Sequence, residues 1–270
     1  MWRFFRTARM GMRSAPFVSR KSLFTTSSAV GAAATMFTGS LIFNDKSVRS
    51  LEGVDVDSSI DPFPTAVTQK ENKLIGSDHK LVATGVRSVT FISFKVYGVG
   101  LYVAAKDEGK IASTVKEYLQ KHEGKSVADL FNDKEISQQL VDDIAQKVPY
   151  AVRITPVRNT DFGHLRDGLT KSILASPMAK TIKQEVGEGV EQLRQVFLGF
   201  KGSVPKNHTL WVISDTKNVS VSYEGKKLTE MGVINEPSIA RVLLVLYLSN
   251  AKPLSESLRK NFVSYVEGQV

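Results

Sequence analysis

The stretch from Gly85 to Val103 constrains the fold more than any other part of the chain. Two runs dense in β-branched and aromatic residues flank a short break at Thr90–Ser93, and this composition suits strands that are half-buried in a sheet. Gly98 and Gly100 share one face of the second run, where glycine lets another backbone or a ligand come close. Arg87 ends the first run and requires an anion, a carbonyl or water as its partner. We predict a β-hairpin with Arg87 either at a solvated rim or facing a ligand.

The sequence around this hairpin alternates between strand-like and helix-like patterns. Apolar residues recur every three to four positions in residues 109–147 and 161–200, which predicts amphipathic helices, and Asp133 or Asn132 can cap one of them. We expect strands over residues 73–104, 150–157, 210–214, 219–223 and 227–233, and further helices over residues 239–248 and 254–266. This order predicts an α+β domain over residues 69–270, in which helices cover one side of an antiparallel sheet.

The first 44 residues differ in composition from the rest of the chain. They contain six basic residues and no Asp or Glu, so they account for most of the net charge of +9. The rest is only weakly basic, which argues against a nucleic-acid partner. Because an arginine-rich, serine-containing and acid-free N-terminus is typical of mitochondrial presequences, we predict that residues 1–44 direct the protein to the mitochondrion.

The end of this leader has a second interpretation. The uncharged run from Ser22 to Asn44 is long enough to cross a bilayer, which needs about 20 residues. It is either a single inner-membrane anchor with the domain in the intermembrane space, which we prefer, or part of a presequence that leads to the matrix. Residues 45–68 are predicted to be an acidic linker, because Pro62 and Pro64 disfavour regular structure.

Several kinds of chemistry are excluded by the sequence. The chain has no cysteine, which rules out disulfides, thiolate metal sites and thiol catalysis. Its four histidines lack zinc-like spacing. Kinase-like fragments within residues 161–167 stand in the wrong order and follow no glycine-rich loop. The polar residues that surround the Arg87 hairpin therefore remain as candidates.

Three blocks of the chain, in this order, resemble the chalcone isomerase-like family and its fungal mitochondrial branch. They are Gly85–Arg87 with Lys95–Tyr102, Val152–Ile154 with His164–Leu169, and Leu246–Ser249 with Lys252–Ser255. The first pair is similar to the G-x-R and K-x-Y-x-x-G-L-Y pattern, and the last to the closing Y-L-G-x-K-P-V-S block of that family. The resemblance implies an open-faced antiparallel sheet, a layer of helices on one side, and a ligand cleft between the two.

The resemblance also implies roles for individual residues. Arg87 matches the arginine that holds the anionic oxygen of the substrate in active members and a carboxylate in fatty-acid-binding members. Tyr97, or Lys95 if the alignment slips, stands where active enzymes have a threonine. His164 stands about where they have a tyrosine, and Lys171 about where they have an asparagine. These departures argue against isomerase activity, which depends on a network of donors around the arginine.

His164 is the most informative of these departures. It lies in the first turn of a predicted helix, beside the apolar stripe of Phe162, Leu165 and Leu169. A neutral imidazole in an apolar cleft can serve as an axial ligand of haem iron, and Arg87 can hold a haem propionate. The alternative is a histidine at a helix start that bonds only to backbone or water.

We therefore predict a mitochondrial, non-catalytic protein that binds a small apolar anion, either haem or a fatty acid. The ligand-binding residues would be Arg87, Lys95, Tyr97, His164 and Lys171, with His164 as the ligand of haem iron. One alternative is an intramolecular lyase or isomerase in which Arg87 holds an oxyanion and Tyr97 acts as the acid. A membrane-tethered interaction protein with a vestigial cleft is the other alternative.

Overall fold

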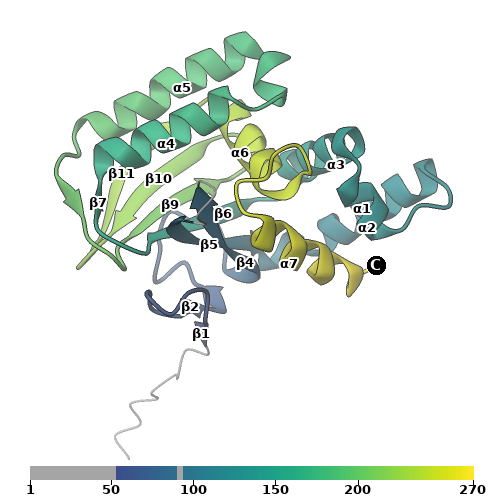
Figure 1. Cartoon of the computed structure of the whole chain (residues 1–270), viewed down its shortest axis with the longest axis horizontal. Helices are drawn as coiled ribbons and strands as arrows, with labels where there is room; N and C mark the ends of the chain where they lie inside the picture. The colour runs from purple at the N-terminus through teal and green to yellow at the C-terminus, as the bar shows by residue number, and fades with distance from the viewer. Residues whose placement is uncertain (1–52, 90–93) are drawn as a thin grey trace, which may run out of the picture. The chain divides into compact units, whose positions relative to one another are not determined.

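The computed structural model describes residues 53–89 and 94–270, and a curled seven-stranded antiparallel sheet forms its centre (Figure 1). The strands follow the order β11-β10-β9-β6-β5-β4-β3 across the sheet. Their bounds are β3 (Ala66–Val67), β4 (His79–Val89), β5 (Phe94–Ala104), β6 (Tyr150–Pro156), β9 (Thr209–Ser214), β10 (Val219–Glu224) and β11 (Leu228–Ile234). Two short antiparallel pairs lie outside it, β1 (Gly53–Val54) with β2 (Phe63–Pro64) and β7 (Thr160–Asp161) with β8 (Ser203–Val204).

Helices cover one face of the sheet, as the sequence predicted (Figure 1). Their bounds are α1 (Gly109–Lys121), α2 (Val127–Asn132), α3 (Lys134–Lys147), α4 (Phe162–Leu174), α5 (Lys183–Leu198), α6 (Ser238–Leu248) and α7 (Glu256–Glu267), with 3-10 turns at Ala105–Asp107 and Met178–Lys180. Asp133 caps α3 by accepting the backbone N–H groups of Glu135 and Ile136. The side chains between the sheet and these helices form one continuous hydrophobic core.

Helix α6 lies at the centre of the helical layer and is buried over nearly its whole length. It packs against α3, α5 and α7, so its apolar residues serve the core, as expected. In the described ranges we find no helix with the length and apolarity needed to cross a membrane. The leader over residues 1–44, with its presequence and anchor interpretations, lies outside the described residues.

The predicted linker over residues 45–68 is wrong for its described part. From residue 53 onward this segment packs on the face of the sheet opposite to the helices, with Phe63 fully buried and Ile60 and Val67 nearly so. The absence of side chains at Gly98 and Gly100 makes room for it, because an added Cβ there would lie 2.4 Å from Ile60 and 2.9 Å from Phe63. The two glycines therefore accommodate another part of the chain.

The pairing of β4 with β5 contains a bulge beside Arg87. Arg87 pairs with Tyr97 and Ser88 pairs with Lys95, so Val96 is an extra residue on β5. The bulge breaks the alternation of side chains, and Val96 and Tyr97 both face the helices. Lys95 instead reaches the opposite side and forms a 2.7 Å ion pair with Asp57.

We expect Phe63→Ala to lower the free energy of unfolding by about 3–5 kcal/mol, because it removes a fully buried aromatic ring. Urea denaturation of the full chain measures the change. The control Val54→Ala, at a residue that is 36% exposed in the same segment, should change stability by less than about 0.5 kcal/mol. Equal, small effects of both substitutions would restore the linker interpretation.

Candidate functional site

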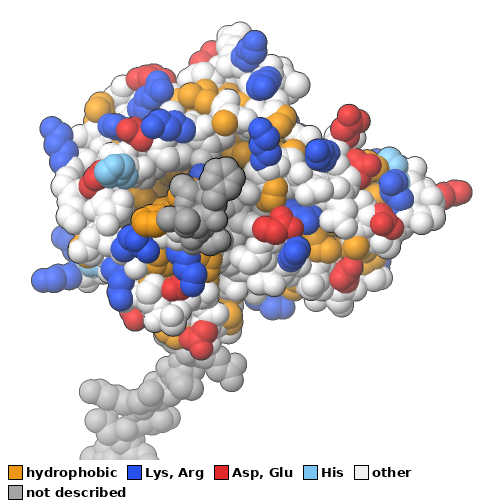
Figure 2. Space-filling model, in the orientation of Figure 1, with side chains coloured by type: hydrophobic (Ala, Val, Ile, Leu, Met, Phe, Trp, Pro, Cys, Tyr) orange, Lys and Arg blue, Asp and Glu red, His pale blue; other side chains and the backbone are white. Residues whose placement is uncertain are grey.

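A cavity of about 650 Å³ lies between the sheet and the start of α4. On the face shown in Figure 2, hydrophobic side chains gather in a hollow that has Lys and Arg side chains beside it. The residues that line the cavity come from β4, β5, β6, β9, α4 and the connection before α4. They are Arg87, Val89, Phe94, Val96, Tyr97, Ile154, Pro156, Arg158, Asn159, Thr160, Asp161, His164, Leu165, Gly168, Leu169 and Leu210.

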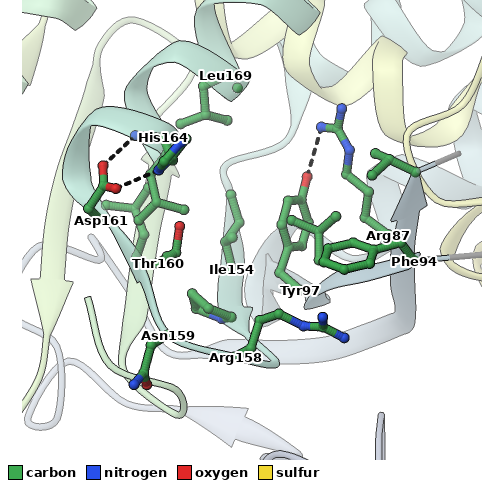
Figure 3. Close-up of a pocket in the computed structure, with 16 residues that line it drawn as sticks. Arg87, Phe94, Tyr97, Ile154, Arg158, Asn159, Thr160, Asp161, His164 and Leu169 are labelled. Carbon is green, nitrogen blue, oxygen red and sulfur yellow. Dashed lines mark hydrogen bonds and ion pairs between the residues drawn. The ribbon is translucent and has the colours of Figure 1, made fainter. Parts of the chain in front are cut away.

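Arg87 is held at one wall of the cavity by neutral hydroxyl groups, and Figure 3 shows its bond to one of them, that of Tyr97. Its Nη1 donates to Tyr97 Oη at 3.2 Å, and both Nη atoms lie 3.2 Å from Ser172 Oγ. Ser172 Oγ in turn donates to the carbonyl of Gly168 at 2.7 Å. Tyr97 Oη lies 2.8 Å from the hydroxyl of Tyr247 on α6. Four elements therefore fix the position of one guanidinium group.

None of these partners neutralises the charge of Arg87. No carboxylate of the described residues lies within ion-pair distance of its guanidinium, which is half-buried. Burial raises the pKa of Tyr247 well above its usual value, and the neighbouring Tyr97 raises it further, so this hydroxyl stays neutral. The result is a positive charge, with donors arranged in a fork, at the wall of an apolar cavity. Such a group is suited to a carboxylate or another oxyanion.

The other polar wall is built at the start of α4 by Asp161 and His164 (Figure 3). Asp161 Oδ1 accepts the backbone N–H of His164 at 2.8 Å and thereby caps the helix, while Oδ2 lies 2.5 Å from His164 Nδ1. These hydrogen bonds, the backbone one first, lower the pKa of Asp161. The carboxylate orients the imidazole and occupies Nδ1, so Nε2 is the nitrogen that can meet a ligand.

The structure brings together three of the residues predicted for the site. Arg87, Tyr97 and His164 all line the cavity, and His164 lies in the first turn of its helix as expected. Its side chain is 80% exposed, so it borders the opening rather than an apolar interior. Within the described chain we find no group of three His, Asp or Glu side chains that could hold a metal ion.

Two predicted residues do not line the cavity. The bulge at Val96 turns Lys95 toward Asp57, and Lys171 is exposed on α4. The next residue, Ser172, reaches Arg87 instead. Its position could have been found from helical spacing, because Leu165, Leu169 and Ser172 share one face of α4.

Tyr247 is a further site residue that the sequence prediction missed. It lies fully buried in an apolar helix, 150 residues away from its partner Tyr97. A tyrosine hydroxyl that is buried in such a helix requires a hydrogen-bond partner, and this requirement is what could have pointed to Tyr247 from the sequence. The sequence could not show which side chain meets it.

Comparisons with known proteins agree with this architecture. The family model described as "Chalcone isomerase like" matches residues 77–263. Two curated relatives, both called altered inheritance of mitochondria protein 18, mitochondrial, come from Debaryomyces hansenii and Kluyveromyces lactis. The first is 49% identical over 77% of this chain and 73% of its own length, and the second 36% identical over 87% and 79%.

A solved structure extends the comparison to the fold. The crystal structure of an Arabidopsis thaliana fatty-acid binding protein superposes with a TM-score of 0.59 and covers 81% of this chain and 98% of its own. At 18% identity this likeness concerns the fold alone, and it confirms the predicted α+β architecture. With its sheet, its helical layer and a family match over most of its length, the chain belongs to the chalcone isomerase-like family.

Proposed function

We propose that this protein is a mitochondrial, non-catalytic binding protein for an apolar ligand that carries a carboxylate, either a fatty acid or haem. The observation that carries the proposal is the uncompensated charge of Arg87, whose only described partners are the neutral hydroxyls of Tyr97 and Ser172. A half-buried cation in an apolar wall is stabilised when an anion reaches it. The carboxylate of the ligand would supply that anion.

The rest of the cavity suits the apolar part of such a ligand. Ile154, Leu165, Leu169 and Leu210 line it, and its volume lies within the range of about 300–1,000 Å³ that is typical of ligand pockets. The structural neighbour is a fatty-acid binding protein, which supports the ligand class, and the fungal relatives are named as mitochondrial proteins, which supports the compartment. Attachment to the inner membrane, facing the intermembrane space, remains a prediction from the leader sequence.

Haem is the carboxylate ligand that the second polar wall favours. His164 offers Nε2 at the opening while Asp161 holds Nδ1, which is the usual arrangement behind a metal-ligating histidine. Arg87 and Arg158 both line the cavity and could hold propionates. These residues therefore fit haem, with His164 as the axial ligand. When bound, haem would supply a redox-active iron.

An intramolecular lyase or isomerase is the alternative that the Arg87 network keeps open. Arg87 would hold an oxyanion and Tyr97, 3.2 Å from it, would act as the acid. Against this reaction, the hydroxyl of Tyr97 is already shared between Arg87 and Tyr247. The threonine, tyrosine and asparagine that the resemblance associates with active enzymes are also replaced here.

We expect Arg87→Ala to weaken the binding of cis-parinaric acid about tenfold to a hundredfold, because a hydrogen-bonded charged group contributes about 1.5–3 kcal/mol. Titration of the fluorescence of this fatty acid measures the loss, and oleate serves as its competitor. Arg194→Ala, an exposed arginine of α5 paired with Glu191, is the matched control and should leave affinity unchanged. Equal affinities of the two variants would contradict the role of Arg87.

We expect protein purified from haem-sufficient cells to show a Soret band that His164→Ala removes. Asp161→Asn should keep the band but weaken haem binding about tenfold to a hundredfold, as loss of an orienting carboxylate does at metal sites. The control His122→Ala, outside the cavity, should leave the spectrum unchanged. A band that survives His164→Ala would move the ligand to another histidine, and no band after adding haem would leave only the fatty-acid proposal.

We expect the protein not to turn over a chalcone, because the hydroxyl of Tyr97 is already engaged by Arg87 and by Tyr247. The measurement is the loss of chalcone absorbance after correction for the spontaneous reaction. Turnover that disappears in both Arg87→Ala and Tyr97→Phe, while Arg194→Ala remains active, would contradict this expectation and establish the lyase alternative.

A further inference from the structure

Two exposed hydrophobic side chains lie at the mouth of the cavity. Val89 ends β4 and Phe94 begins β5, and they are paired across the hairpin. They are 38% and 40% exposed, and both also line the cavity. Large apolar side chains in such a position are available for contact with another phase or molecule.

A basic side chain covers one of them. The guanidinium of Arg158 lies 4.0 Å from the ring centroid of Phe94, and Figure 3 shows the two side chains together. Arg158 is exposed and forms no ion pair with a described residue. We call Val89, Phe94 and Arg158 the mouth patch.

The Arg and Asp side chains that line the cavity do not balance in charge. Arg87 and Arg158 are positive, and the carboxylate of Asp161, which hydrogen-bonds to His164, is negative. Neither arginine forms an ion pair with a described residue. The cavity mouth therefore combines an exposed apolar pair with a net positive charge.

We propose that the mouth patch docks onto the surface of an anionic lipid bilayer. Phe94 and Val89 would enter the boundary between headgroups and acyl chains, and Arg158 would remain at the level of the anionic headgroups. Three side chains are too few for a stable protein interface, which buries more than about 1,000 Å². A few apolar and basic side chains are sufficient for weak, reversible contact with a membrane.

This inference rests on the proposed function, because contact with a membrane would bring the cavity to the place where the proposed ligand is concentrated. A fatty acid or haem is strongly apolar, so its concentration in a bilayer far exceeds that in water. With the mouth patch on the membrane, the ligand can enter the cavity without crossing bulk water. Its carboxylate would then meet Arg87 at the cavity wall.

The absence of cysteine allows a local reporter in the full chain. We would label Ser88→Cys, exposed on β4 beside the mouth patch, with the fluorophore NBD, and compare it with labelled Ser113→Cys on α1. The probes are ligand-free vesicles of phosphatidylcholine, with or without phosphatidylglycerol and with or without nitroxide-bearing lipid. A reporter near the mouth separates docking there from membrane binding by the leader.

We expect NBD at position 88 to brighten on phosphatidylglycerol vesicles and to be quenched by nitroxide lipid, while NBD at position 113 does neither. Phe94→Ser and Arg158→Gln should each weaken the response about fivefold, and Arg158→Lys, which keeps the charge, should stay near wild type. Val89→Ser provides a second apolar test should Phe94→Ser fail to fold. High salt should weaken the response as well.

Three outcomes would overturn docking: no response at position 88, an equal response at position 113, or a response unaffected by both Phe94→Ser and Arg158→Gln. Titration with cis-parinaric acid, without vesicles, tests the ligand separately. Ligand binding without a vesicle response would refute docking and leave the proposed function intact. A vesicle response without binding of the fatty acid or haem would support docking while refuting the ligand.

Discussion

The site depends on a guanidinium group that neutral partners hold in place. Placing a cation in an apolar wall is unfavourable, and charged side chains that are buried in proteins are usually paired. Here Tyr97 and Ser172 accept hydrogen bonds from Arg87, and the hydroxyl of Tyr247 forms a hydrogen bond with that of Tyr97. Hydroxyls fix the direction of the guanidinium without cancelling its charge, so the electrostatic attraction for an incoming anion is kept.

This arrangement explains why the hairpin is bulged at Val96. The extra residue lets Tyr97 face the helical side while Lys95 faces the opposite side and pairs with Asp57. On that opposite side Phe63 packs over the glycines of β5, so both faces of the strand are held. A strand fixed on both faces keeps Tyr97, and through it Arg87, in position before a ligand arrives, which reduces the entropy lost on binding.

The elements of the fold could be predicted because their signals are local. The period of apolar residues, the cap at Asp133 and the apolar α6 identify helices and strands without knowledge of their partners. The buried segment around Phe63 could not be predicted, since its prolines and acids resemble a linker and its burial depends on distant glycines. Tyr247 was hidden for the same reason, because only the folded chain brings it to Tyr97.

Within the site, there are structural reasons why Lys95 and Lys171 do not line the cavity. Alternation along a strand puts Lys95 and Tyr97 on one face, and only the bulge separates them. On α4, neighbouring residues differ in direction by about 100°, so Lys171 points to solvent while Ser172 reaches Arg87. A family pattern that is aligned without knowledge of the bulge and of the helix direction cannot decide which of two residues, one or two positions apart, faces the cavity.

The two polar walls of the cavity make different demands on a ligand. The Arg87 wall is built from strands and internal helices, whereas the other depends on Asp161, which both caps α4 and orients His164. A linear carboxylate needs only the first wall and can leave the imidazole in water. A planar ligand with a metal centre and its own carboxylates would contact both walls. Its affinity would then also depend on the side chains at the start of α4. Under the proposed function, selectivity between the two ligand classes would therefore lie in the Asp161–His164 pair, and affinity for any carboxylate would lie in Arg87.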